Sequence, residues 1–96
     1  SKSTATRIPI IKKDDIKIDC NHSSILASMQ IIAKDQKGLF AYVAKIFDDF
    51  NVALESAKLH TLKGYARDLI LIEKNGNFCS KQEDILNLMC IGDKEN

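Results

Sequence analysis

The sequence predicts an α+β fold in which one antiparallel sheet carries two helices on one face. Two observations lead to this fold class. Segments with strand alternation and segments with helical spacing follow one another in the order strand, strand, helix, strand, strand, helix, and the turns between them are short. At 96 residues the chain has room for a single domain.

The N-terminal part contains two short segments before the first long strand. Residues 1–15 are expected to be a linker or tail, in which Arg7–Ile11 could be extended and Pro9 would confine it to a sheet edge. Ile16–Asp19 alternates apolar and polar residues, and turn residues follow it. Ile25–Ala33 is predicted as the next strand. Its alternation puts Ala27, Met29, Ile31 and Ala33 on one face.

An amphipathic helix is predicted after this strand. Its apolar residues recur at spacings of three and four: Leu39, Val43, Ile46, Phe47 and Phe50. Asp35 is well placed as the N-cap, and Asn51 ends the helix. Gly38 lies just inside the helix start, where glycine costs about 1 kcal/mol relative to alanine.

The next two strands are predicted to form a hairpin. Val52–Leu62 and Tyr65–Glu73 are long enough to pair, and Lys63 and Gly64 supply the turn. The alternation of apolar and polar residues along Val52–Leu62 is interrupted near Glu55–Ser56, which predicts a bulge.

A second helix is expected near the C-terminus, where Ser80 and Glu83 match a capping box ahead of an apolar run. The order of elements is then that of a ferredoxin-like fold without its last strand. The final "CIGDKEN" is too polar for a core strand, so we expect Ile16–Asp19 to take that place, antiparallel to Ile25–Ala33. The predicted domain covers residues 16–91, and residues 92–96 form a C-terminal tail.

Composition argues against several classes of partner. The chain has 14 basic and 13 acidic residues, a balance that gives no broad field to attract nucleic acid or an anionic membrane. RNA-binding domains with this element order stack bases on aromatic side chains of the central strands, whereas Tyr65 is the only aromatic residue of its strand. No apolar run approaches the roughly 18 residues needed to span a bilayer.

The cysteines and the start of the chain suggest where the protein resides. Cys20, Cys79 and Cys90 include no C-x-x-C pair, so we expect reduced thiols of a cytoplasmic protein and no zinc or dithiol site. No signal peptide is visible, and the chain begins without an initiator methionine. An intracellular piece of a longer protein is the expected origin.

We find no catalytic constellation. His22 and His60 lie in a turn and a strand without helical metal-ligand spacing, and no P-loop, G-x-S-x-G or G-x-G-x-x-G motif occurs. We therefore expect no catalytic residue, metal or cofactor in this chain. A binding function fits better, because the bare helix start at Gly38 exposes amides that could hold a small carboxylate. The alternative explanation of Gly38 is close packing of the helix start against the sheet.

The segment "KDQKGLFAYVAKIFDDFNVALESAKLHTLKGYARDLILIE" resembles an ACT domain, a small regulatory module that binds amino acids. The resemblance rests on a strand followed by D-x-x-G-L, a helix, an N-[IV] strand and a hairpin, and it covers roughly Ile16–Met89. The stretch "ESAKLHTLKGYARDLILI" is similar to the A-x-[IL]-x-T-x-G-x-x-x-x-D hairpin of the ACT domains that end bacterial PII uridylyltransferases. The residues that match the hairpin pattern are Ala57, Leu59, Thr61 and Asp68.

The resemblance implies a ligand site between two domains. One domain would contribute Asp35, Gly38 and neighbouring residues, and the other would contribute Asn51. The implied ligand-binding residues are Asp35, Gln36, Lys37, Gly38, Leu39, Phe40 and Asn51. In this arrangement the amides of Gly38 and Leu39 would hold the ligand carboxylate, Asp35 its ammonium and Asn51 a side-chain amide.

The implied function is glutamine sensing by a non-catalytic domain of a uridylyltransferase/uridylyl-removing enzyme that modifies PII. Two alternatives remain open: a structural ACT domain that pairs without ligand, and an ACT domain that regulates an amino-acid biosynthetic enzyme. Leu69–Ile72 leaves both faces of its strand apolar, so the uncovered face is expected to meet a neighbouring ACT domain or a second copy.

Overall fold

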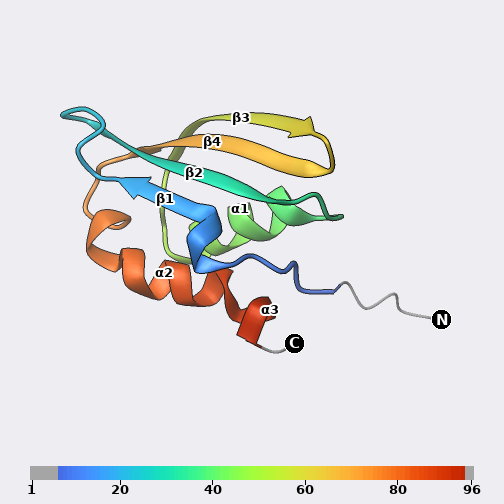
Figure 1. Ribbon diagram of the computed structural model, residues 1–96. Helices are drawn as coiled ribbons and strands as arrows, with labels where there is room; N and C mark the ends of the chain where they lie inside the picture. Colours follow the sequence, from blue (N-terminus) through green and yellow to red (C-terminus); the bar gives the residue numbers. More distant parts are fainter. Residues whose placement is uncertain (1–6, 95–96) are drawn as a thin grey trace.

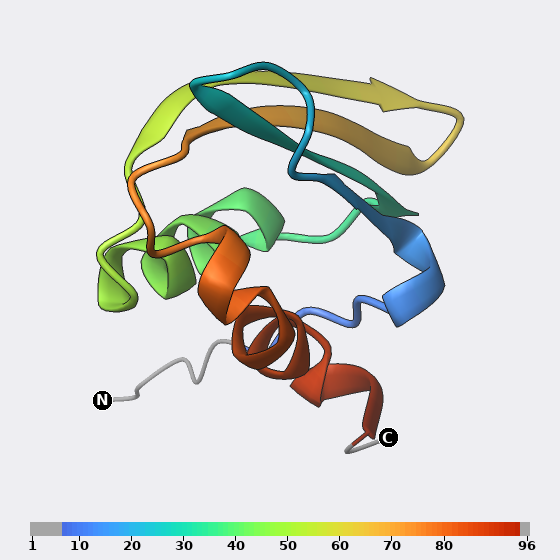
Figure 2. The ribbon, with the colours of Figure 1, turned by 90° about the vertical axis from the view of Figure 1, so that its left-hand side faces the viewer.

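The computed structural model describes residues 7–94. Residues 1–6 of the predicted N-terminal tail (1–15) and residues 95–96 of the predicted C-terminal tail (92–96) lie outside the described residues. The structure is α+β, with a four-stranded antiparallel sheet in the order β1-β2-β4-β3 and the helices on one face (Figures 1 and 2). The elements are η1 (Lys13–Asp15), β1 (Ile16–Asp19), β2 (Leu26–Lys34), α1 (Leu39–Asp49), β3 (Leu54–Leu62), β4 (Tyr65–Glu73), η2 (Cys79–Lys81), α2 (Gln82–Met89) and α3 (Ile91–Lys94). This arrangement is compatible with a ferredoxin-like fold.

The sheet confirms the predicted pairing of its strands. β1 lies antiparallel to β2 at the edge, with Ile16 opposite Ile31, and so occupies the place that the C-terminal residues cannot fill. β3 and β4 form the predicted hairpin, and the register shifts once, between Leu54 and Ser56, as the slip in alternation predicts. Lys63 and Gly64 both have positive φ, the conformation that a tight two-residue hairpin turn needs.

The core lies between the inner face of the sheet and the helices. The predicted face of β2 is buried, and four of the five apolar residues predicted for the first helix are buried in α1. The rings of Phe47 and Phe78 meet edge to face at 5.9 Å, which joins α1 to the segment before α2. The Tyr42 hydroxyl donates to the Leu88 carbonyl at 2.8 Å and ties the two helices together.

The packed unit begins earlier than the predicted boundary at residue 16. Arg7–Ile11 joins no strand of the sheet, so the expected edge strand does not form. Pro9 and Ile11 are buried, and Ile11 belongs to the core. Gly92 of α3 packs so closely on the Pro9 carbonyl that a Cβ would overlap it. The segment predicted as a linker is therefore held in the helical layer.

Both predicted helix caps are wrong. Gly38, not Asp35, is the N-cap of α1, and no side chain caps this helix. α2 begins at Gln82 after η2, without a capping box, and the Ser80 hydroxyl donates to the Gly76 carbonyl instead. In both places a preceding turn moves the N-cap beyond the predicted residue, from Asp35 to Gly38 in α1 and from Ser80 to Lys81 in α2.

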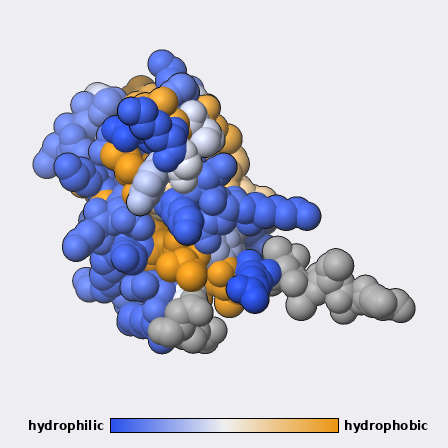
Figure 3. All heavy atoms as spheres, turned by 45° about the vertical axis from the view of Figure 1, so that its right-hand side comes forward, coloured by the Kyte–Doolittle hydropathy of each residue, from blue (hydrophilic) through white to orange (hydrophobic). Residues whose placement is uncertain are grey.

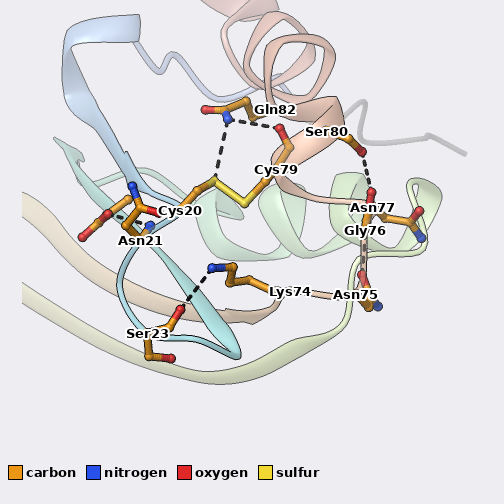
Figure 4. Close-up of a disulfide and its surroundings, with 11 residues drawn as sticks. Cys20, Asn21, Ser23, Lys74, Asn75, Gly76, Asn77, Cys79, Ser80 and Gln82 are labelled. Carbon is orange, nitrogen blue, oxygen red and sulfur yellow. Dashed lines mark hydrogen bonds between the residues drawn. A yellow bond between two sulfur atoms is a disulfide. The ribbon is translucent and has the colours of Figure 1, made fainter.

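A disulfide joins Cys20 to Cys79, so the expectation of reduced thiols is wrong for this pair (Figure 4). The bond connects the β1–β2 loop to η2 across 59 residues of chain. Around it, the Lys74 ammonium donates to the Ser23 carbonyl at 3.1 Å, which holds the same loop against the end of β4. Cys90 is a buried free thiol.

On the face drawn in Figure 3, hydrophilic residues predominate and hydrophobic residues are exposed between them. Within residues 7–94, no helix has the length and apolar character needed to cross a bilayer.

We predict that the disulfide contributes about 2–4 kcal/mol to the free energy of unfolding, because it closes a long loop in the unfolded chain. Urea unfolding with and without dithiothreitol measures this difference. The double variant Cys20→Ser/Cys79→Ser serves as the control and should be insensitive to the reductant. A titration of the denatured, non-reduced chain that finds three free thiols would contradict the pairing.

Candidate functional site

A hollow of about 280 Å³ lies between the start of α1 and the inner face of the β3–β4 hairpin. Three parts of the chain line it: the loop after β2, the first turn of α1, and the facing halves of β3 and β4. The lining residues are Asp35, Gln36, Gly38, Leu39, Phe40, Ala41, Leu59, Thr61, Ala66 and Asp68. The hollow forms because α1 starts beyond the end of β2 and leaves this end of β3 uncovered, where Leu59 remains 53% exposed.

Gly38 opens α1 in a left-handed conformation, with φ 77°. A Cβ at this position would have no atom within 4 Å, so close packing against the sheet is not the reason for glycine. The left-handed backbone itself favours glycine. Gly38 lines the hollow, so a side chain here would occupy open space at the helix start.

The first turn of α1 presents amide groups to the hollow. The Leu39 amide donates to the Gln36 carbonyl at 3.3 Å, a long bond, and the Tyr42 amide begins the regular helical bonds by donating to Gly38. Within the described part of the chain, we find no hydrogen bond from the amides of Phe40 and Ala41. These donors and the positive end of the helix dipole can attract an anion.

Two carboxylates face the same hollow. Asp68 on β4 is only 5% exposed, and Asp35 lies at the end of β2. Burial raises the pKa of Asp68, a hydrogen bond from the His60 backbone amide lowers this pKa, and the nearby Asp35 charge raises it again. Among residues 7–94, no lysine or arginine lines the hollow. The hollow therefore combines amide donors on one wall with uncompensated carboxylates on the other.

The hollow brings together five of the seven residues predicted for the ligand site: Asp35, Gln36, Gly38, Leu39 and Phe40. Lys37 is exposed and does not line it. Asn51 lies at the opposite end of α1, about 16 Å away for an 11-residue helix. Its φ of 56° lets it end the helix, and the Asn77 side chain donates to its carbonyl at 2.9 Å.

The Gln36 side chain already has partners within the chain. Its Oε1 accepts from the Ile10 amide at 2.8 Å, and its Nε2 donates to the carbonyls of Ile10 at 2.7 Å and Lys34 at 3.0 Å. This side chain fastens the N-terminal segment to the end of β2. Its predicted contact with a ligand stays a prediction.

A second hollow, of about 450 Å³, adjoins the first on the other side of Asp35 and Gln36. Lys12, Lys34 and Asp15 line it together with Tyr65, so opposite charges are mixed along its wall. It is larger than the first hollow, but it lacks a helix start and a buried ionisable group. We therefore place the candidate site in the smaller hollow.

Asp68, Leu59 and Thr61 line the hollow but are not among the residues predicted for the ligand site. The alternation of β4 does carry a signal, because Asp68 occupies the same face as the buried Ala66 and Ile70. A carboxylate at a buried position of a strand calls for an explanation. Leu59 and Thr61 are harder to assign from the sequence. The bulge in β3 interrupts the alternation of side chains between the two faces of the strand, so the face of these residues cannot be counted from its start.

Comparison with protein-family models and with curated proteins found no match for this chain.

We predict that Gln36→Leu destabilises the fold by about 1–3 kcal/mol, because the backbone groups of Ile10 lose their partners. Limited proteolysis should then cleave near residues 7–12 faster than in wild type. The exposed Lys37→Leu is the matched control. Equal cleavage rates in the two variants would contradict the fastening role of Gln36.

We predict that Asp68→Asn stabilises the protein at neutral pH. The folded-state pKa of Asp68 is raised above its ordinary value of 3.8, so the folded chain holds this proton more tightly than the unfolded chain. The free energy of unfolding should then fall as pH rises from 3.8 through the raised pKa. The variant lacks this fall, and its amide oxygen can still accept from His60.

Thermal melts over a pH series test this expectation. Asp68→Asn should melt above wild type near pH 7, and the gap should close below pH 3.8. Asp48→Asn, at an exposed position, is the control. A variant that melts below wild type at pH 7 would show that the carboxylate is stabilising.

Proposed function

We propose that this chain is a regulatory domain of the ACT type that binds glutamine or a similar small amino acid. The observation that carries the proposal is the hollow at the start of α1, which pairs free amides with two carboxylates. A free amino acid has one carboxylate and one ammonium, so its charges complement those of the hollow. The sheet order supports the proposal, since β1 stands where the resemblance requires a substitute for the last strand.

In the proposed complex the ligand carboxylate lies against the first turn of α1. The amides of Gly38 and Leu39 were the expected donors. Because the Leu39 amide already donates to Gln36, the free amides of Phe40 and Ala41 extend this donor set. Asp35 takes the ligand ammonium, and Asn51 of a second domain contacts the ligand side chain.

The regulated enzyme is proposed to be a PII uridylyltransferase/uridylyl-removing enzyme, of which this chain forms a non-catalytic part. Regulation of an amino-acid biosynthetic enzyme is the alternative within the same class. The proposed location is the cytoplasm, where the Cys20–Cys79 bond would be exceptional, because disulfides are rare in cytosolic proteins.

A second candidate function is pairing with another domain without any ligand. The observation that favours it is β3, an edge strand in which seven of nine residues are exposed. Its free backbone groups could add to a sheet edge of a neighbouring ACT domain or a second copy. Leu69, 40% exposed on the outer face, offers a further apolar contact.

We predict that Gly38→Asn weakens glutamine binding at least tenfold while the fold survives. Asparagine tolerates the left-handed backbone, and its side chain enters open space above the helix start. Isothermal calorimetry measures the affinity, and a thermal melt measures folding.

Gly64→Asn is the matched control, because Gly64 also has positive φ and open space but does not line the hollow. Wild-type chain at high concentration should gain thermal stability from glutamine, since a ligand that binds the folded state raises its stability. If no common amino acid shifts the melt, pairing without ligand becomes the better explanation. If Gly38→Asn binds glutamine with unchanged affinity, the ligand does not bind in this hollow.

A further inference from the structure

We infer that Asp68 binds the ligand ammonium together with Asp35, and that the site selects ligands by their cationic amino group before their carboxylate. This inference deepens the proposed function and rests on it for the position of the site. It names a residue that the sequence-based ligand set did not contain.

The position of Asp68 supports this role. It lies near the middle of β4, where its neighbours across the sheet are Ile31 on β2 and Leu59 on β3. Neither neighbour can neutralise a carboxylate. Asp68 faces the hollow on the helix side of the sheet and is 95% shielded from solvent. A buried carboxylate without a cation is costly, and proteins normally pair such a group or bind a cation with it.

Every element around Asp68 leaves its charge uncompensated. From β3, Leu59 and Thr61 line the hollow, and the His60 backbone amide supplies the hydrogen bond that lowers the pKa of the carboxyl. The loop after β2 adds Asp35, a second negative charge. From α1 the lining residues are apolar, and α1 contributes amides but no cationic side chain. A ligand ammonium between the two carboxylates would supply the missing positive charge.

The charge pattern defines the ligand class. A primary ammonium satisfies both carboxylates and carries three donors, which suits it to two acceptors at once. The amides of Phe40 and Ala41 then orient a carboxylate but are not required for the cation to bind. Two relatives of glutamine separate these roles: 4-aminobutanamide keeps the ammonium and lacks the carboxylate, and glutaramate keeps the carboxylate and lacks the ammonium.

Binding should be linked to the proton of Asp68. The cation prefers the ionised carboxylate, so ligand binding lowers the pKa that burial and Asp35 raise. By the same linkage, affinity for the amine increases as pH rises through the pKa of the free protein. Asp35, which shares the hollow, is the other titratable group that faces Asp68 there.

The test follows the Asp68 carboxyl carbon by NMR through a pH titration of the full 96-residue chain. The titration is run alone, with glutamine, with 4-aminobutanamide and with glutaramate. Both amines should lower the Asp68 pKa, and glutaramate should not. Asp68→Asn should weaken binding of 4-aminobutanamide about tenfold or more, as expected for a lost hydrogen bond to a charged group, and Asp48→Asn should leave it unchanged.

The outcomes separate this inference from the proposed function. If glutamine binds but neither the Asp68 pKa nor the affinity of Asp68→Asn changes, the inference is overturned and the proposed function stands. If 4-aminobutanamide binds at Asp68 and no amino acid does, the inference stands and the proposed function falls. If none of the three compounds binds and the Asp68 pKa is unchanged, the chain has no ammonium site here and both fail.

Discussion

The nine-residue ladder between β2 and β4 is the constraint on which the rest of the structure depends. It pairs Lys34 with Tyr65, which brings the hairpin turn beside Asp35, whose amide donates to the Gly64 carbonyl at 2.9 Å. Because side chains alternate along a strand, the same register turns Asp68 toward the helices and Leu69 toward the outside. A slip of one residue would exchange them, and it would place a carboxylate on the outer face and remove it from the hollow.

The buried Asp68 carboxylate lowers the stability of the free chain, and the proposed ligand ammonium would offset this cost. A neutral residue at this position would pack in the sheet without the cost of desolvating a charge. The chain instead keeps a carboxylate where burial and Asp35 both disfavour its ionised form. Strain of this kind at the wall of an open hollow is typical of binding sites, where a ligand charge later offsets it. The proposed ammonium contact gives this arrangement a physical purpose.

Periodicity predicted most of the fold, because alternation and three-to-four spacing report directly which side of a segment is buried. It placed β1 beside β2, the hairpin turn at Lys63–Gly64 and the bulge before Ser56. It failed where distant contacts decide the structure: Ile11 is held in the core by tertiary packing, and Cys20 meets Cys79 only after folding. The D-x-x-G-L motif likewise predicted the loop residues that line the hollow. The strand residues that line it depend on how far α1 covers β3, and no local sequence pattern determines this.

The length of α1 explains why one copy would hold only half of the proposed site. Gly38 and Asn51 flank the two ends of this rigid helix, so they cannot reach the same small ligand within one chain. Both sit outside the regular turns, with positive φ, and both are exposed on the surface. A two-fold pairing that sets Gly38 of one copy against Asn51 of another would complete two identical sites at once, because each contact in such an interface occurs twice. Under the proposed function, ligand binding and pairing are therefore coupled, and a ligand that bridges the two helix ends must also strengthen the dimer.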